Sequence, residues 1–191
     1  MKKLVLFPSL IFLLLESCSL NFETPIAELH TPTFEMHISQ KGRVIKLTDP
    51  ISGINHLAQD SIVSLMSLRV DGLIQTPKAA EFKNDILYLQ FERERTAQIK
   101  VIEKESYITF ELHALTKAQE VDLIIWGPYS TSINKIIGET IGVVRGETFA
   151  LGIQSLNLKT LGGYPWHESD RMPQLDIFRA GDNTDMATRT D

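Results

Sequence analysis

The segment Ile86–Leu112, ILYLQFERERTAQIKVIEKESYITFEL, contains three successive runs in which apolar and polar side chains alternate. The runs at residues 86–91, 97–103 and 107–112 have the period of two that is typical of half-buried β-strands. Short charged or polar stretches at residues 92–95 and 104–106 separate them. We therefore expect three antiparallel strands joined by turns.

The same alternation continues along the chain on both sides of this segment. Asp71-Gly72 and Lys83-Asn84-Asp85 have the residues of hairpin turns. About ten strands at a spacing of roughly 8 to 12 residues predict an all-β fold, an antiparallel β-sandwich of the supersandwich kind, over residues 33–166. The further strands are expected at residues 33–39, 43–48, 61–70, 79–82, 121–126, 141–145 and 149–153.

Two segments depart from the alternating pattern. Val121–Trp126 is apolar apart from Asp122, and we expect a strand that is buried on both faces. Ser130–Ile137 is expected to be the one short helix, because its three isoleucines are spaced i, i+3 and i+4 and Gly138 follows them.

The composition is that of an ordinary globular domain. With 191 residues, of which 43% are hydrophobic, the chain is long enough to remove about two thirds of its unfolded surface from water in one core. The net charge is −5. Because no stripe of lysine and arginine is present, nucleic acid is not expected as a partner.

The first residues have the composition of an export signal. Lys2 and Lys3 precede an apolar run, residues 4–15, that is too short to span a ~30 Å bilayer comfortably. The only cysteine, Cys18, follows almost directly. This start resembles a bacterial lipoprotein signal peptide, in which the cysteine is lipidated and becomes the new N-terminus. An ordinary secretory signal with an incidental cysteine is the alternative.

These features predict the organisation and location of the chain. We expect residues 1–17 to be a signal peptide and residues 18–32 to be a tether, with acyl chains on Cys18 holding the exported protein at a membrane of the cell envelope, in the periplasm or at the cell surface. Residues 167–191 are polar and acidic. They are expected to be a polar tail or the start of a missing downstream domain.

Two aromatic loops form the predicted ligand-binding surface. Trp126 and Tyr129 flank a Gly-Pro turn, and Tyr164 and Trp166 flank a proline beside His167. Aromatic faces can stack on the apolar side of a sugar ring, and a histidine can hydrogen-bond a polar ligand. The alternative is that Trp126 is a core residue, that Tyr129 hydrogen-bonds a loop and that the second segment is a solvated loop.

No complete catalytic or metal-binding constellation is visible in the sequence. A nucleophile elbow, Gly-x-Ser-x-Gly, does not occur. One histidine and two acids within residues 167–170 are a weak metal signal, and His37 and His113 are interpreted as ordinary sheet residues. We therefore expect no catalytic residue, metal or cofactor in this chain.

Residues 126–178, which begin WGPYSTSINKIIGETIGVVRGETFALG, are similar to the N-terminal β-sandwich region of large exported bacterial lipoproteins that degrade glycans, α-galactosidase-like or uncharacterised. LTDPISGINHL and SLRVDGLIQTP extend the resemblance more loosely. It implies glycoside hydrolase relatives that continue well beyond the position of Asp191, so that this chain is a truncated member. The chain would then be a non-catalytic module that contacts glycan or a catalytic domain. The alternative is a purely structural packing domain without activity.

Overall fold

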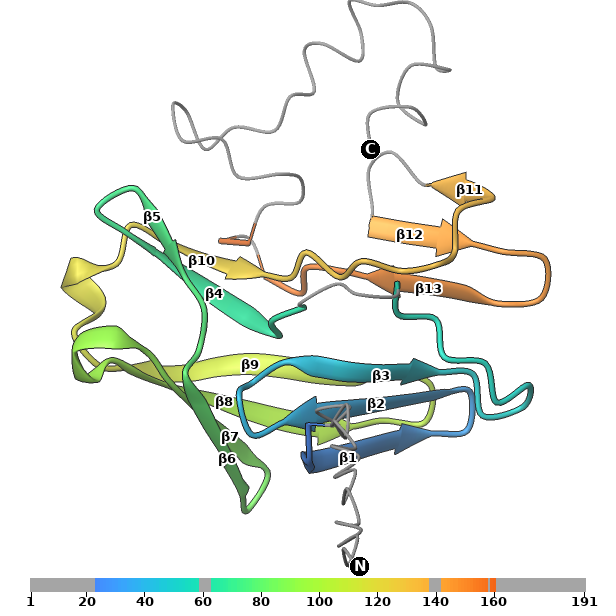
Figure 1. Ribbon diagram of the computed structural model, residues 1–191, viewed down its shortest axis with the longest axis horizontal. Helices are drawn as coiled ribbons and strands as arrows, with labels where there is room; N and C mark the ends of the chain where they lie inside the picture. The colour runs from blue at the N-terminus through green and yellow to red at the C-terminus, as the bar shows by residue number, and fades with distance from the viewer. Residues whose placement is uncertain (1–22, 59–62, 138–141, 158, 161–191) are drawn as a thin grey trace, which may run out of the picture.

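The computed structural model describes residues 23–58, 63–137, 142–157 and 159–160. These residues form thirteen strands in four antiparallel sheets, with two single-turn 3-10 helices at Glu92–Glu94 and Ala118–Glu120 (Figure 1). The strands are β1 (Pro25–Thr31), β2 (Phe34–Ser39), β3 (Val44–Thr48), β4 (Met66–Val70), β5 (Leu73–Gln75), β6 (Ala79–Lys83), β7 (Ile86–Gln90), β8 (Thr96–Glu103), β9 (Ile108–Leu115), β10 (Leu123–Trp126), β11 (Ile136–Ile137), β12 (Gly142–Arg145) and β13 (Ala150–Ile153). The fold is therefore all-β and sandwich-like, as the alternation predicted.

The sheets are arranged in layers around one core. In Figure 1, β4, β5 and β10 and the β11–β13 sheet lie on one side, and β1–β3 and β6–β9 lie on the other. Burying a valine, leucine, isoleucine, phenylalanine or methionine side chain between the layers stabilises the fold by about 1.5 to 3 kcal/mol. The buried apolar residues of this core are Ala27, Leu29, Met36, Ile38, Val44, Leu47, Val63, Leu65, Met66, Leu68, Val70, Leu87, Leu89, Phe91, Ala97, Ile99 and Val101.

The segment Ile86–Leu112, in which three strands are predicted, contains β7, β8 and most of β9 of the four-stranded sheet β6-β7-β8-β9. Leu87 of β7 lies opposite Ile99 of β8, and Leu89 lies opposite Ala97. All four of these side chains are buried, because side chains directly opposite one another in a ladder share one face of the sheet. The period of two therefore places one face of this sheet in the core.

The first sheet begins earlier than expected. Residues 25–31 lie within the predicted tether, but they form β1 and pair with β2. Pro25 is the first residue of the strand, where a missing N–H is tolerated. Ala27 and Leu29 point into the core. The tether prediction is therefore wrong for these residues.

The strand that is buried on both faces is β4 rather than β10. All five residues of β4 are buried, whereas all four residues of β10 are only partly buried. In the sheet order β10-β4-β5, β4 is central and β10 is at the edge. The expectation that Val121–Trp126 is buried on both faces is thus corrected by its position at an edge.

Residues 130–137 do not form the predicted helix. Thr131 pairs with Leu57 in an isolated β-bridge, and Ile136–Ile137 is β11. The Ser132 N–H donates to the His56 carbonyl oxygen at 2.8 Å. The bridge and this hydrogen bond pair the segment with residues 56–57, and bends at residues 132 and 135 replace the helical turns. In the described part of the chain, no helix is long and apolar enough to cross a membrane.

The turn between β2 and β3 joins several parts of the molecule. Its Gly42 is buried, has φ +66° and stands so close to Leu89 that a Cβ would lie 2.8 Å from the leucine Cδ2. The Gly42 carbonyl oxygen accepts a hydrogen bond from the Leu65 N–H at 3.0 Å. The neighbouring Gln40 carbonyl oxygen accepts one from the Ala80 N–H at 2.6 Å. This turn therefore requires glycine both for its conformation and for its close approach to the core.

Candidate functional site

The first predicted aromatic loop packs against the body of the fold. Trp126 is the last residue of β10, lies opposite Met66 and is half-buried. Its ring centroid is 6.5 Å from that of Phe110, at an interplanar angle of 40°. One part of the indole thus belongs to the core, and ligand contact by the rest of the ring stays a prediction.

Tyr129 is anchored to β4 through its side chain. The hydroxyl donates a hydrogen bond to the Leu65 carbonyl oxygen at 2.7 Å. Burial raises the pKa of the Tyr129 hydroxyl well above its ordinary value. Because this hydroxyl already has a partner inside the protein, Tyr129 ties the loop after β10 to the start of β4. Contact of Tyr129 with a ligand stays a prediction.

The second aromatic loop and the lipidation site lie outside the described residues. These are Tyr164, Trp166 and His167, together with Cys18 and the signal peptide. Their roles stay predictions from the sequence. Among the described residues, Trp126 and Tyr129 are therefore the predicted site residues whose positions the structure gives.

An open pocket lies beside the turn that joins β12 and β13, and we call it the β12–β13 pocket. Three separate segments of the chain meet there. Its lining residues are Ile54, His56, Ser132, Ile133, Asn134, Lys135, Gly146, Glu147, Thr148 and Phe149. The Ser132 N–H donates to the His56 carbonyl oxygen, and pairing of Ile136 with Arg145 brings the 146–149 turn beside residues 132–135. The pocket thus depends on pairing between residues that are far apart in the sequence.

A stacked pair of rings forms the apolar part of the β12–β13 pocket. The His56 imidazole and the Phe149 ring have centroids 4.5 Å apart and an interplanar angle of 1°. Both residues are partly exposed. The Nε2 atom of His56 is buried and has no hydrogen-bond partner among the described residues. The pocket therefore offers a stacked pair of rings, both partly exposed, whereas the buried Nε2 atom faces the protein interior.

Polar and charged side chains surround this ring pair. Lys135 and Glu147 form an ion pair across the pocket, and both are exposed. Ser132 and Asn134 add a hydroxyl and an amide to the lining. A small hydroxylated molecule with one apolar face would find both stacking and hydrogen-bonding groups here.

A second polar cluster lies on the face of β1–β3 that is turned away from the apolar residues Ala27, Leu29 and Met36. Glu28 is opposite His37 and His30 is opposite Glu35 in the β1–β2 ladder. The Glu35 carboxylate accepts hydrogen bonds from the His37 Nε2 at 2.7 Å and from the Lys46 Nζ at 2.9 Å. The hydrogen bond from Lys46, followed by that from His37, holds the pKa of the Glu35 carboxyl below its ordinary value. Glu35 is therefore ionised at neutral pH.

Sequence reasoning missed both groups of residues. His56 carries no motif of its own and Phe149 lies in a predicted strand, and their stacking joins residues more than ninety positions apart. His37 was interpreted as an ordinary sheet residue. The alternation of Glu28, His30, Glu35 and His37 along two paired strands was the signal in the second case. The pairing of these two strands cannot be predicted when residues 18–32 are interpreted as a tether.

Comparison with known proteins gives no relative. No protein-family model, curated protein or solved structure matches the chain.

Proposed function

We propose that this chain is a non-catalytic β-sandwich module of an exported, lipid-anchored carbohydrate-processing protein, and that it contacts glycan through the β12–β13 pocket. The observation that carries the proposal is the stacked pair of His56 and Phe149 beside polar groups. Carbohydrate sites in general combine an aromatic surface for the C–H face of the sugar with hydrogen-bonding groups for its hydroxyls. Attachment of the module through lipid on Cys18 is supported by the sequence pattern of residues 1–18.

Affinity electrophoresis with the full-length chain in detergent tests the glycan contact. The chain is run through gels that contain a panel of soluble polysaccharides, and retardation by at least one of them is expected. Phe149→Ala removes the ring that stacks on His56. The affinity for the polysaccharide, obtained from the retardation, should fall about tenfold, which corresponds to about 1.4 kcal/mol of binding free energy. Tyr107→Ala is the matched control, because Tyr107 is an exposed aromatic in a different turn. Equal retardation of the parent and the Phe149 variant would exclude this pocket.

The aromatic residues predicted from the sequence are tested in the same gels. If Trp166 belongs to the binding surface, the Trp166→Ala variant should also be retarded less than the parent. In that case the Phe149→Ala variant should still show part of the parent's retardation. If only Phe149→Ala loses retardation, the surface consists of the β12–β13 pocket alone. Acylation of Cys18 is tested separately by metabolic labelling with a radioactive fatty acid, in which Cys18→Ser should remain unlabelled.

A second function, a packing domain for a further protein domain, is favoured by a different observation. Apolar side chains are exposed at and next to the β11–β13 sheet, with Ile136 54%, Ile153 46% and Leu156 72% exposed. Exposed apolar groups of this kind are typical of surfaces that pack against another protein. This function predicts binding of a hydrophobic dye by the chain and no retardation by any polysaccharide. Ile136→Thr together with Leu156→Thr should reduce the dye signal.

A further inference from the structure

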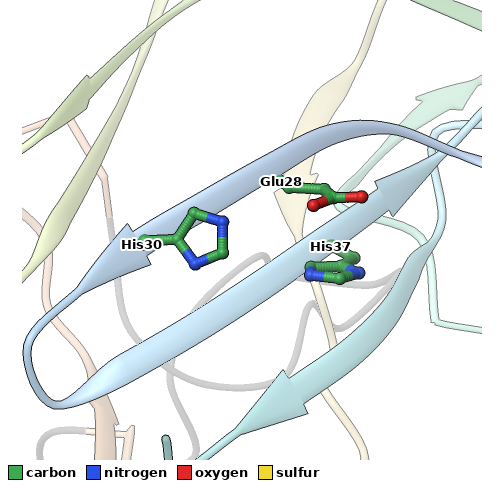
Figure 2. Close-up of side chains that lie close together, drawn as sticks. All are labelled: Glu28, His30 and His37. Carbon is green, nitrogen blue, oxygen red and sulfur yellow. The ribbon is translucent and has the colours of Figure 1, made fainter.

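We propose that Glu28, His30 and His37 form a binding site for a divalent transition-metal ion, best matched by zinc, and that Glu35 positions His37 within it. This site is independent of the proposed glycan contact, because it belongs to β1 and β2 and not to the β12–β13 pocket. Figure 2 shows Glu28 and His30 on one strand and His37 on its neighbour.

The ligand set fits zinc chemically. Two imidazoles and one carboxylate are a common set of protein ligands for zinc, in sites that leave one coordination position open. One ligand atom from each of Glu28, His30 and His37 can be chosen so that all three lie within 4.8 Å of one another. Ligand atoms around tetrahedral zinc are roughly 3.4 Å apart, given bond lengths of about 2.0 to 2.1 Å. Metal binding therefore requires the ligand atoms to approach one another by up to about 1.4 Å.

The strand ladder explains why these groups converge. Glu28 and His37 are directly opposite residues of β1 and β2, and such pairs point to the same side of a sheet. His30 is two positions after Glu28 and so lies on the same side. The rings of His30 and His37 are 6.2 Å apart and nearly perpendicular. The backbone pairing thus fixes the positions from which all three side chains project.

The three residues differ in exposure in a way that suits this approach. The His37 side chain is only 14% exposed and is held at its Nε2 by Glu35. That arrangement leaves the Nδ1 lone pair of His37 as the available metal ligand when Nε2 carries the proton. Glu28 and His30 are exposed and can change rotamer to close the remaining distance. One ligand is therefore preset and two are adjustable.

Glu35 has the role that carboxylates usually have beside metal-binding histidines. Such a carboxylate accepts a hydrogen bond from the ring nitrogen that does not bind the metal, and so fixes the tautomer and the ring orientation. Its second oxygen is bonded to Lys46, so the ammonium group on the same face is paired. The carboxylate of Glu103 accepts the backbone N–H of His30 at 2.7 Å and adds negative charge near the site. The local charge favours a cation.

Zinc titration of the full-length chain by calorimetry tests the proposal. His30→Gln should bind one equivalent of zinc less than the parent. The difference in stoichiometry between the two proteins is the readout, so zinc that both bind at other positions cancels. Glu35→Gln should retain the stoichiometry and weaken affinity about 10- to 100-fold. His113→Gln is the matched control, because His113 is an exposed histidine in another strand, and it should behave as the parent.

The cobalt(II) spectrum adds a second readout of the same site. Intense visible absorption from tetrahedral cobalt should appear in the parent and in His113→Gln, and should be lost in His30→Gln. Circular dichroism checks that each variant keeps its β-sheet content, which is expected because His30 is exposed. Equal zinc stoichiometry in the parent and in His30→Gln, or no zinc bound by a folded parent chain, would overturn the proposal.

Discussion

The strands β4 and β12 occupy equivalent positions in their sheets, yet their environments differ. Each is the central strand of a three-stranded antiparallel sheet, with the orders β10-β4-β5 and β11-β12-β13. All five residues of β4 are buried, whereas three of the four residues of β12 are exposed. Backbone hydrogen bonding is the same in kind, so the difference arises from the side-chain layer that covers each strand.

This contrast indicates that one region of the molecule stabilises the fold and that another is exposed for contact with other molecules. β4 lies in the layer that packs against β1–β3 and β7–β8, and residues such as Leu65 and Leu68 are fully buried. In the β11–β13 sheet, one face has Leu151 packed on the core and the other presents Ile136 and Val143. We infer that the body built around β4 supplies most of the folding free energy, and that the β11–β13 sheet and its pocket are available for contact.

Truncating one leucine in the body around β4 and one next to the β11–β13 sheet should give the largest difference in unfolding free energy. Leu68→Ala leaves a cavity at a fully buried position and should lower the free energy of unfolding by about 3 kcal/mol. Leu156→Ala removes the same atoms at a position that is 72% exposed and should change it by less than about 0.5 kcal/mol. Urea denaturation monitored by tryptophan fluorescence measures both. Equal losses would remove the distinction between the two regions.

The glycine of the β2–β3 turn provides the next largest test. Gly42→Ala places a Cβ at positive φ and 2.8 Å from Leu89, and should cost about 2 to 3 kcal/mol. Gly72 also has positive φ, but no atom lies within 4 Å of its added Cβ. Gly72→Ala should therefore cost only about 1 kcal/mol. The same denaturation experiment compares them, and equal costs would show that close packing at Gly42 is unimportant.

The buried arginine of the body gives a smaller effect. Arg95 is 1% exposed, and its guanidinium is 2.6 Å from the carboxylate of Glu120. Glu120→Gln should destabilise the fold by about 1 to 2 kcal/mol, because it weakens the pairing of a buried charge. Glu92→Gln is the matched control, since Glu92 forms an exposed pair with Lys78, and its expected cost is below about 1 kcal/mol. A larger effect at Glu92 than at Glu120 would contradict this assignment.

The smallest expected effect is the pH dependence contributed by Glu35. Its pKa is lowered, first of all by the hydrogen bond from Lys46. A carboxyl whose pKa is lower in the folded state stabilises the fold above its unfolded pKa of about 4.3, and this stabilisation is lost as the pH falls through the folded value. Unfolding free energies measured from about pH 6 to pH 3 should therefore fall less steeply for Glu35→Gln than for the parent. Parallel curves for the two proteins would contradict the role of Lys46.

The sequence predicted the parts of the fold that depend on local alternation. Alternation predicts β7, β8 and β9 because one face of their sheet is buried and the other is not. Apolar and polar residues therefore alternate along each strand in step with burial. β1 was missed because Pro25 and Pro32 resemble the ends of a linker, although a proline fits the first position of a strand. Local pattern does not reveal which distant strand a segment pairs with.

The failed helix prediction has the same cause. Isoleucines at i, i+3 and i+4 fit a helix face, but Ile133 is buried in a segment without regular secondary structure and Ile136 belongs to β11. The deciding interaction is the bridge between Leu57 and Thr131, which joins residues far apart in the chain. The stacked pair of His56 and Phe149 arises in the same way, so neither the pocket nor its ring pair was predictable from neighbouring residues.

Hydrogen exchange of the full-length chain, followed residue by residue or by peptide, tests most directly whether the two regions differ. The account predicts that amides of β2, β4, β7 and β8 exchange only through global unfolding, and that amides of β11–β13 exchange by local opening at a much lower free energy. Equal protection of β4 and β12 would contradict it.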